Sequence, residues 1–274
     1  MAAAGAVPPL FSVILPTFNR KCFVMRTIQS VLGQTVGDFE LIVIDDGSSE
    51  DYLADARALR DGRVNVIRSA VNLGAAKARN VGIGASHGQY VSFIDDDDEW
   101  RESFLASTLA RLKDTPAEVG MSWCGVECVT PDSADVPVVT SSRDYSTVAA
   151  DSPALHAAFL SIGTGFGLTV KRQCLAHIGL FDPDLKTVED TDWLLRALRA
   201  GFVPVVVPGI HVIVHNHDQE RMTNSANHGV RLRECEWLLA KYATFFDMNP
   251  IAQSSVTDQI RRLRDGMAPI WSTV

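Results

Sequence analysis

Four consecutive aspartates, Asp95 to Asp98, follow directly on a short apolar run, Tyr90 to Ile94. The run is β-branched and aromatic, which predicts a strand buried in a sheet. Adjacent carboxylates repel one another, so a fold accommodates them at low cost only where a cation binds or water reaches them all. Ligands bind at the carboxyl ends of strands in open α/β sheets, and the aspartates therefore mark a candidate site for a hard cation. The alternative is a solvated acidic turn in which Asp98 or Glu99 caps the next helix.

Three other polar clusters contain residue types that could act together with these carboxylates. The pair Asp45-Asp46 follows a second apolar run, and the pair Glu189-Asp190 stands where a helix is predicted to begin. The segment His215 to Arg221 contains two histidines and an arginine. Taken singly, each cluster also has a structural explanation, namely an Asx turn, a helix cap and a polar loop.

Alternating apolar runs and helical spacings predict the elements that position these clusters. In the first part of the chain, predicted strands and helices alternate and are joined by short links. This alternation is typical of an α/β protein with a parallel, doubly wound sheet. The predicted strands are Phe11 to Leu15, Phe39 to Ile44, Val64 to Ile67 and Tyr90 to Ile94, and the predicted helices are Cys22 to Leu32, Tyr52 to Leu59 and Leu73 to Ala85.

The pattern is less regular after Trp100. The segment Thr130 to Ala150 is polar and has no period, which predicts a flexible loop that becomes ordered over bound ligand as a lid. Beside this loop, the predicted strands are Val119 to Cys128, Thr164 to Val170, Val203 to Val207 and Ile210 to Val214, and the predicted helices are Phe104 to Leu112, Ala154 to Leu160, Arg172 to Ile178, Trp193 to Arg199, Val230 to Phe246 and Val256 to Leu263.

The expected organisation is one α/β domain between a short tail and a helical extension. The tail covers residues 1–10, the domain 11–225 and the extension 226–274. Within the domain, residues 11–100 have the character of a nucleotide-binding half, and residues 101–225 form a second, substrate-side half.

Composition narrows the class of protein. The chain of 274 residues is 46% hydrophobic and 21% charged, with a net charge of −8, so it has a folded core and is not disordered. No basic block stands out, which argues against nucleic acid as a partner. No apolar run reaches membrane-spanning length, and the Ala-rich start lacks the basic residues of a secretion signal. The five scattered cysteines are expected to be reduced thiols in a cytoplasmic protein.

Several segments, taken together, are similar to the motifs of one enzyme family. They cover residues 11–220 in that family's order and spacing. The chain resembles the family 2 glycosyltransferases, which are inverting enzymes with the GT-A fold. This resemblance implies a Rossmann-like, mostly parallel sheet with a smaller acceptor-side region and C-terminal helices. The matching segments are 12–19, 30–35, 45–48, 72–80, 95–98, 179–182 and 189–190.

The resemblance implies a donor site for a nucleotide sugar with a UDP, dTDP or GDP moiety. Pro16 to Phe18 would hold the base and ribose, and Asp46 would accept a hydrogen bond from a ring nitrogen of the base. Arg79 would neutralise donor charge or brace the aspartates, and Arg221 would hold the diphosphate. The residues assigned to the donor are Pro16, Thr17, Phe18, Asp46, Arg79, Asp95, Asp96 and Arg221.

A metal site is also implied, because the aspartate run corresponds to the family's DXD motif. Asp97 would bind Mn²⁺ or Mg²⁺, whereas Asp95 or Asp96 would contact the donor ribose or Arg79. Aspartate at all four places leaves this register open by one residue. His215 would be a further metal ligand, with His217 as the second choice, and an imidazole suits Mn²⁺ better than Mg²⁺.

The implied reaction is a metal-dependent, inverting sugar transfer to a hydroxyl or amine. Asp190 would be its general base, because an inverting transfer needs one base opposite the leaving diphosphate. The structural alternative is that Asp190 or Asp192 only caps the helix.

The sequence disfavours two other functions. A sugar nucleotidyltransferase would have a glycine-rich phosphate loop, but residues 16–20 contain no glycine. An inactive nucleotide-sugar-binding module is disfavoured by the intact pair Glu189-Asp190. The expected acceptor is a small molecule, a glycan or a lipid-linked molecule, and the C-terminal helices are a candidate homodimer interface.

Overall fold

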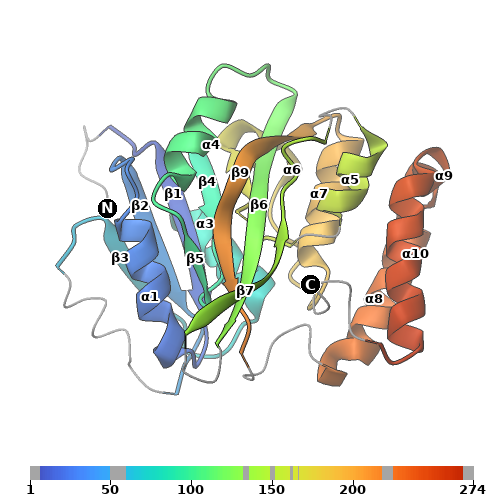
Figure 1. Ribbon diagram of the computed structural model, residues 1–274, viewed down its shortest axis with the longest axis horizontal. Helices are drawn as coiled ribbons and strands as arrows, with labels where there is room; N and C mark the ends of the chain where they lie inside the picture. The colour runs from blue at the N-terminus through green and yellow to red at the C-terminus, as the bar shows by residue number, and fades with distance from the viewer. Residues whose placement is uncertain are drawn as a thin grey trace.

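Four parallel strands form the first half of the sheet in the computed structural model (Figure 1). The structure describes residues 7–49, 60–131, 136–148, 152–160, 163–165, 167–217 and 225–267. The strands lie in the spatial order β3-β2-β1-β4 and agree with the four predicted runs. Their bounds are Phe11–Thr17 for β1, Phe39–Asp45 for β2, Val64–Arg68 for β3 and Tyr90–Phe93 for β4.

The register of these strands brings the predicted polar turns together. Thr17 at the end of β1 lies opposite Asp45 at the end of β2, and Ile14 of β1 lies opposite Phe93 near the end of β4. Because parallel strands end at the same edge of a sheet, the turns after β1, β2 and β4 lie side by side. The expected α/β fold with a mostly parallel, doubly wound sheet is confirmed.

The second half extends the same sheet with mixed pairing. Across the described residues, nine strands form one sheet, in which β4 continues into the order β8-β6-β9-β5. Strand β8 is antiparallel to both β4 and β6, β9 is parallel to β6, and β5 is antiparallel to β9. Their bounds are Asp98–Trp100 for β5, Val119–Pro131 for β6, Pro137–Arg143 for β7, Thr169–Lys171 for β8 and Val203–His215 for β9.

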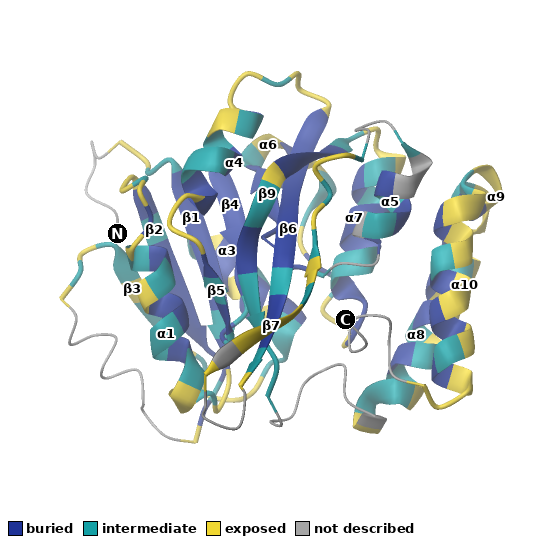
Figure 2. Ribbon diagram, viewed as in Figure 1, coloured by how far each residue is buried: buried dark blue, intermediate teal, exposed yellow. Residues whose placement is uncertain are grey.

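Helices cover both faces of the sheet, and Figure 2 shows the central strands buried. Side chains alternate between the faces along each strand, so Val13 packs with α1 and α4 while Ile14 packs with α3 and α7. The C-terminal helices α8 and α10 add to the second of these cores, and α10 packs against α5. The bounds are Lys21–Leu32 for α1, Ala75–Ala85 for α3, Phe104–Leu112 for α4, Pro153–Phe159 for α5, Arg172–Ile178 for α6, Glu189–Arg199 for α7, His228–Lys241 for α8, Ala243–Met248 for α9 and Pro250–Arg264 for α10.

The flexible loop expected over residues 130–150 is wrong in part, because the segment contains strand β7. The segment starts as the end of β6 and returns as β7, which pairs antiparallel with β6. β7 lies at the sheet edge, and Val138 and Val139 are both exposed, so its sequence lacks the alternation that marks a half-buried strand. β7 pairs with the strand directly before it in the chain, but its polar, Pro- and Ser-containing sequence does not indicate a strand.

Other predicted boundaries also shift. Asp98 and Glu99 do not cap a helix: they form β5, and α4 begins only at Phe104. The two strands expected over 203–207 and 210–214 are one strand, β9, whose pairing with β6 shifts where Gly209 has φ +92°. The helix expected over 230–246 is divided into α8 and α9, and the strand expected over 164–170 is only the short β8. The helix expected over 52–59 lies outside the described residues.

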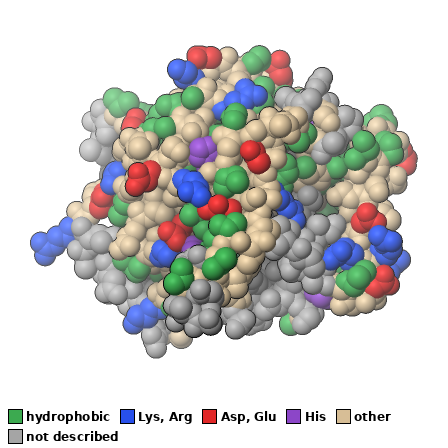
Figure 3. Space-filling model, in the orientation of Figure 1, with side chains coloured by type: hydrophobic (Ala, Val, Ile, Leu, Met, Phe, Trp, Pro, Cys, Tyr) green, Lys and Arg blue, Asp and Glu red, His purple; other side chains and the backbone are tan. Residues whose placement is uncertain are grey.

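On the face drawn in Figure 3, acidic and basic side chains lie beside one another. Ion pairs at the surface include Arg264–Glu236 and Arg261–Asp258. Among the described helices, none combines the length and apolarity needed to cross a membrane.

Candidate active site

Asp46 is fixed at the edge where β1 and β2 end. Its backbone N–H donates to the Thr17 carbonyl over 2.9 Å. Its carboxylate accepts hydrogen bonds of 2.8 Å from the backbone N–H groups of Leu73 and Gly74, just before α3. Burial raises the pKa of Asp46. A carboxylate has about four acceptor positions, so lone pairs remain for a ligand.

The turn after β1 follows the Thr17 carbonyl that accepts from Asp46, and it presents an exposed aromatic ring. Phe18 is 42% exposed, and Pro16 before it is half-buried. Asn19 ties this turn to the turn after β2, because its N–H donates to Ser48 Oγ and its Oδ1 accepts from the N–H of Ser49, both over 2.9 Å. An open aromatic ring beside a fixed carboxylate can hold a flat, polar-edged heterocycle.

The side chain of Asp96 is buried. Thr17 Oγ1 donates to Asp96 Oδ2 over 2.6 Å, and Thr27 Oγ1 of α1 lies 3.0 Å and 2.7 Å from the main-chain oxygens of Asp96 and Asp98. Burial, reinforced by the neighbouring charge of Asp97, raises the pKa of Asp96 to about 7. Asp96 therefore fastens the aspartate turn to β1 and α1.

Arg79 joins the aspartate turn to the helix that carries Asp190. Its side chain on α3 is only 7% exposed, and Nη2 lies 2.8 Å from Asp95 Oδ1 while Nη1 lies 2.7 Å from Glu189 Oε1. The Asp95 side chain is 39% exposed and the Glu189 side chain 5%. A planar guanidinium that serves two carboxylates at once fixes their separation.

Asp97 faces the other way, toward Arg20 and His217. Arg20 Nη1 lies 3.1 Å and His217 Nε2 lies 2.9 Å from Asp97 Oδ2. The imidazole of His217 also stacks on Phe23, with ring centroids 4.4 Å apart. His215, the first-choice histidine, lies instead against Glu99, whose Oε1 is 2.6 Å from His215 Nε2. The structure thus brings His217, and not His215, to Asp97.

Asp190 is the second residue of α7, and a glycine-containing segment, residues 163–165, approaches it closely. Its Oδ1 accepts from the N–H of Thr191 over 2.7 Å, and its Oδ2 accepts from the N–H of Thr164 over 3.2 Å. A Cβ on Gly163 would lie 2.5 Å from Asp190 Oδ2, and a Cβ on Gly165 would lie 2.4 Å from Asp95 Oδ2. Segment 163–165 therefore runs closely past both carboxylates, which places Asp95 and Asp190 on one side of the molecule.

The sequence alone predicts no role for Arg20 or this glycine segment, and it marks Glu189 only as the neighbour of Asp190. Arg20 stood within a matching turn, but nothing local linked it to Asp97, which is 77 positions away. The sequence Gly163-Thr164-Gly165 was a usable signal, since two glycines around a threonine indicate a close backbone approach. Arg221 lies outside the described residues.

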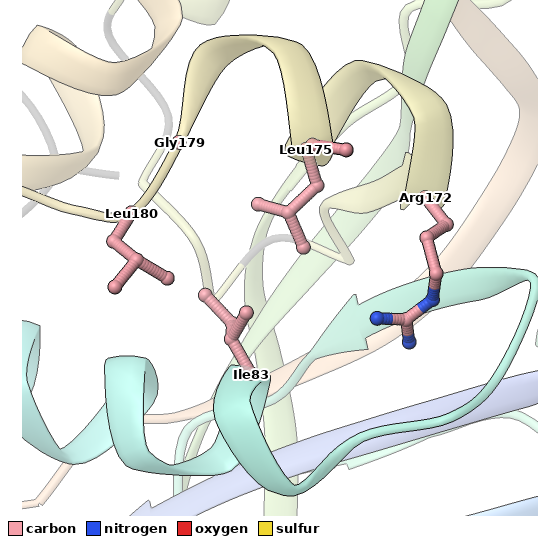
Figure 4. Close-up of a pocket in the computed structure, with 6 residues that line it drawn as sticks. Ile83, Arg172, Leu175, Gly179 and Leu180 are labelled. Atoms are coloured by element: carbon pink, nitrogen blue, oxygen red, sulfur yellow. The ribbon is translucent and has the colours of Figure 1, made fainter.

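A separate hollow of about 320 Å³ lies between α3 and α6 (Figure 4). In the close-up, the side chains of Ile83, Leu175 and Leu180 point toward one another, and Arg172 lies at one end. Arg172 donates to Ser86 Oγ over 3.0 Å. None of the six residues that line this hollow belongs to the site at the strand ends, and an apolar lining offers little to a diphosphate.

Glu189 is expected to contribute to the pH dependence of folding stability. Burial first, and then the neighbouring charge of Asp190, raises its pKa from 4.5 to about 7. Between these two pH values, the folded state holds a proton that the unfolded chain has lost. The contribution of Glu189 to the free energy of unfolding is therefore full below pH 4.5 and is lost as the pH rises through 7. Glu189→Gln should flatten this decline in the free energy of unfolding. Urea denaturation between pH 5 and pH 8 measures it, and an unchanged slope would contradict the assignment.

Comparison with known proteins places the chain in a family. Residues 12–134 match the family described as glycosyl transferase family 2. The putative colanic acid biosynthesis glycosyl transferase WcaA of Escherichia coli K12 is 30% identical over 223 residues, 79% of this chain and 76% of its own length. The putative teichuronic acid biosynthesis glycosyltransferase TuaG of Bacillus subtilis is 28% identical over 197 residues, 71% of this chain and 74% of its own length.

Two solved structures share the fold. TarS 1–349 of S. aureus, in complex with UDP-GlcNAc, has a TM-score of 0.67 at 19% identity over 84% of this chain and 66% of that one. The mannosyltransferase PcManGT of Pyrobaculum calidifontis, in complex with GDP-Man and Mn²⁺, has a TM-score of 0.63 at 18% identity over 95% of this chain and 74% of that one.

The sheet and the helices that cover it define a GT-A fold. The chain belongs to glycosyltransferase family 2, and the predicted fold, family and enzyme class are confirmed.

Proposed function

We propose that the protein is an inverting, metal-dependent glycosyltransferase that moves a sugar from a nucleoside diphosphate sugar to a hydroxyl or amine. The observation that carries the proposal is the contact of Arg79 with both Asp95 and Glu189. This guanidinium links the carboxylates assigned to the donor with the residue next to the assigned base. The acceptor belongs to a small molecule, a glycan or a lipid-linked molecule.

The donor is proposed to bind along the turns after β1 and β2. Phe18 and Pro16 would pack on the base, and Asp46 would accept a hydrogen bond from the base with the lone pairs that Leu73 and Gly74 leave unused. Asp95, which is partly exposed, fits a ribose hydroxyl better than Asp96, which is buried. Arg221 remains the proposed partner of the diphosphate.

Asp97 and His217 are the proposed metal ligands. A carboxylate oxygen and an imidazole nitrogen 2.9 Å apart suit Mn²⁺. Among the described residues, no group of three or more ligating side chains is gathered. An ion at a nucleotide site is commonly bound through one or two carboxylates together with phosphate oxygens and water. When bound, the ion would neutralise the diphosphate as it leaves.

Asp190 is the proposed general base. Its carboxylate would take the proton of the acceptor as the acceptor oxygen or nitrogen bonds to the anomeric carbon and the bond from that carbon to the diphosphate breaks. The N–H groups of Thr164 and Thr191 orient the carboxylate. Glu189, held by Arg79, fixes the position of this end of α7 relative to Asp95.

A thermal-shift screen of UDP, GDP and dTDP with Mn²⁺ and with EDTA tests the donor site. A ligand at a hundredfold excess over its dissociation constant stabilises the protein by about 2.7 kcal/mol, which shifts the melting temperature measurably. One nucleotide is expected to stabilise strongly, and only with Mn²⁺. Equal melting temperatures under all conditions would contradict a nucleotide site.

The two histidines are expected to differ in their effect on metal affinity. His217→Ala should weaken Mn²⁺ binding in the presence of the selected nucleotide by about 10–100-fold, the usual effect of losing a contact at a metal site. His215→Ala should leave it nearly unchanged, because His215 pairs with Glu99. A Mn²⁺ titration by calorimetry measures both, and a larger effect for His215 would reverse the assignment.

A further inference from the structure

Helix α8 makes a concentrated set of polar contacts with the base-carrying part of the protein. It lies outside residues 12–134, the part of the chain that matches the family. Figure 1 shows α8 beside α10 in the C-terminal part of the molecule, where both contribute to the core that includes α7. The contacts of α8 reach α7 and the loop that leads into it, on both sides of Asp190.

Glu234 binds the loop directly before α7. Its Oε1 accepts from the N–H of Lys186 over 2.9 Å, and its Oε2 accepts from the N–H and the Oγ1 of Thr187 over 2.9 Å and 2.6 Å. One carboxylate thus takes three hydrogen bonds from two residues that lie three and four positions before Asp190. Hydrogen bonds to an ionised acceptor are about twice as strong as neutral ones.

Arg231, three residues before Glu234 on α8, also binds this loop. Its Nη1 donates to the Thr187 carbonyl over 3.2 Å, and Arg231 is only 8% exposed. With the Gln259 amide oxygen turned toward it, Gln259 of α10 accepts from Nη2 over 2.9 Å and from Nε over 3.0 Å. Both polar groups of the Thr187 backbone are therefore bound by α8.

The C-terminal end of α8 and the residue after it hold α7 just past Asp190. Lys241 Nζ lies 2.7 Å and Tyr242 Oη lies 2.6 Å from Asp192 Oδ1, and Asp192 is fully buried. Arg196 Nε pairs with the other oxygen over 2.9 Å. A buried carboxylate with three donors is held rigidly, since losing any donor would leave a charge inadequately solvated.

We infer that Glu234 is a positioning residue for Asp190: it sets the place and angle at which α7 begins, and through this the distance between Asp190 and the donor carboxylates. The inference rests on the proposed role of Asp190 as the base. A small displacement of a reacting group costs rate steeply, about 10²-fold for 1 Å. Glu234 would therefore affect kcat, whereas the donor, held by β1, β2 and the aspartate turn, would bind as before.

The test compares Glu234→Ala, Glu234→Gln and the control Glu236→Ala. Glu236 lies on the same helix, and its exposed carboxylate pairs with Arg264 of α10. Turnover is followed as nucleoside diphosphate release, with Mn²⁺, from the UDP-, GDP- or dTDP-linked sugar whose nucleotide the screen selects. Glu234→Ala should lower kcat by about 10–100-fold, the typical effect of a residue that orients a functional group, with KM for the donor within twofold. Glu236→Ala should match the wild type.

A double variant separates positioning from mere stabilisation of the fold. When Asp190→Asn has removed the group that Glu234 positions, adding Glu234→Ala should lower kcat by less than threefold, because residues that act as a unit are not additive. Full additivity, a change confined to KM, or normal turnover of Glu234→Ala would overturn the inference. If Asp190→Asn itself turns over normally, the proposed base is wrong, and that result is distinct from these.

Glu234→Gln keeps the test decisive if Glu234→Ala fails to fold. The amide retains one acceptor oxygen and therefore at most part of the three hydrogen bonds. An intermediate loss of kcat, about 3–10-fold, is expected on this basis, since each neutral hydrogen bond contributes about 0.5–1.5 kcal/mol. Wild-type kcat in a folded Glu234→Gln protein would overturn the inference.

Discussion

Asp190→Asn is expected to lower turnover by about 10²–10⁴-fold, the usual contribution of a general base, with little change in donor affinity. Asparagine has the size of aspartate and keeps one oxygen to accept from Thr164 or Thr191, so α7 should still begin at the same place. What it lacks is the basic oxygen that takes the acceptor proton. Rates of nucleoside diphosphate release and nucleotide binding by calorimetry measure the two quantities separately.

Asp184→Asn is a matched control for this variant. Asp184 is exposed and lies six positions before Asp190 in the chain, so the same chemical change is made outside the site. Its turnover should equal that of the wild type. An Asp190→Asn protein that also transfers at the normal rate would remove Asp190 as the base.

Asp97→Asn is expected to abolish the Mn²⁺-dependent part of nucleotide binding. The amide still offers an oxygen to Arg20, so the ion pair becomes a hydrogen bond from a charged donor to a neutral acceptor, and the local structure is retained. Repulsion among the four aspartates alone predicts that removing one of them stabilises the protein. The structure argues against such a gain, because Asp97 has Arg20 and His217 as partners, and a small loss of stability is expected instead.

Glu99→Gln is the control for the metal experiment. Glu99, like Asp97, pairs with a histidine and an arginine at the same end of the sheet, but it lies on β5 beside His215. Calorimetry with the selected nucleotide, with and without Mn²⁺, should show metal dependence in Glu99→Gln and none in Asp97→Asn. Metal dependence retained in Asp97→Asn would move the metal ligand to another aspartate of the run.

The alternating half of the fold could be predicted because its signals are local. Each buried parallel strand is a continuous apolar run, and the polar residues that end β1, β2 and β4 must meet at one edge. A link from Arg79 to the aspartates could also be predicted, in this case from the family resemblance. The structure identifies Asp95 as the aspartate involved.

The remaining features depend on contacts between distant segments. β9 ends at His215, and its pairing with β5 brings His215 next to Glu99, so that His217 beyond the strand reaches Asp97. No spacing rule within the sequence distinguishes these two histidines. Likewise, Glu234 binds the loop before α7 from 47 positions away, and nothing local in the sequence links these two segments.

The most direct test of the central claim is the release of nucleoside diphosphate from UDP-, GDP- and dTDP-linked sugars by the wild-type protein, with Mn²⁺ and with EDTA. The proposed mechanism predicts release from one class of donor with Mn²⁺, loss of that release with EDTA, and its recovery when Mn²⁺ is restored. Release that is equally fast in EDTA would contradict metal dependence. No release from any donor, from a protein that binds the nucleotide, would contradict the assignment of Asp190 and its neighbours as a working catalytic site.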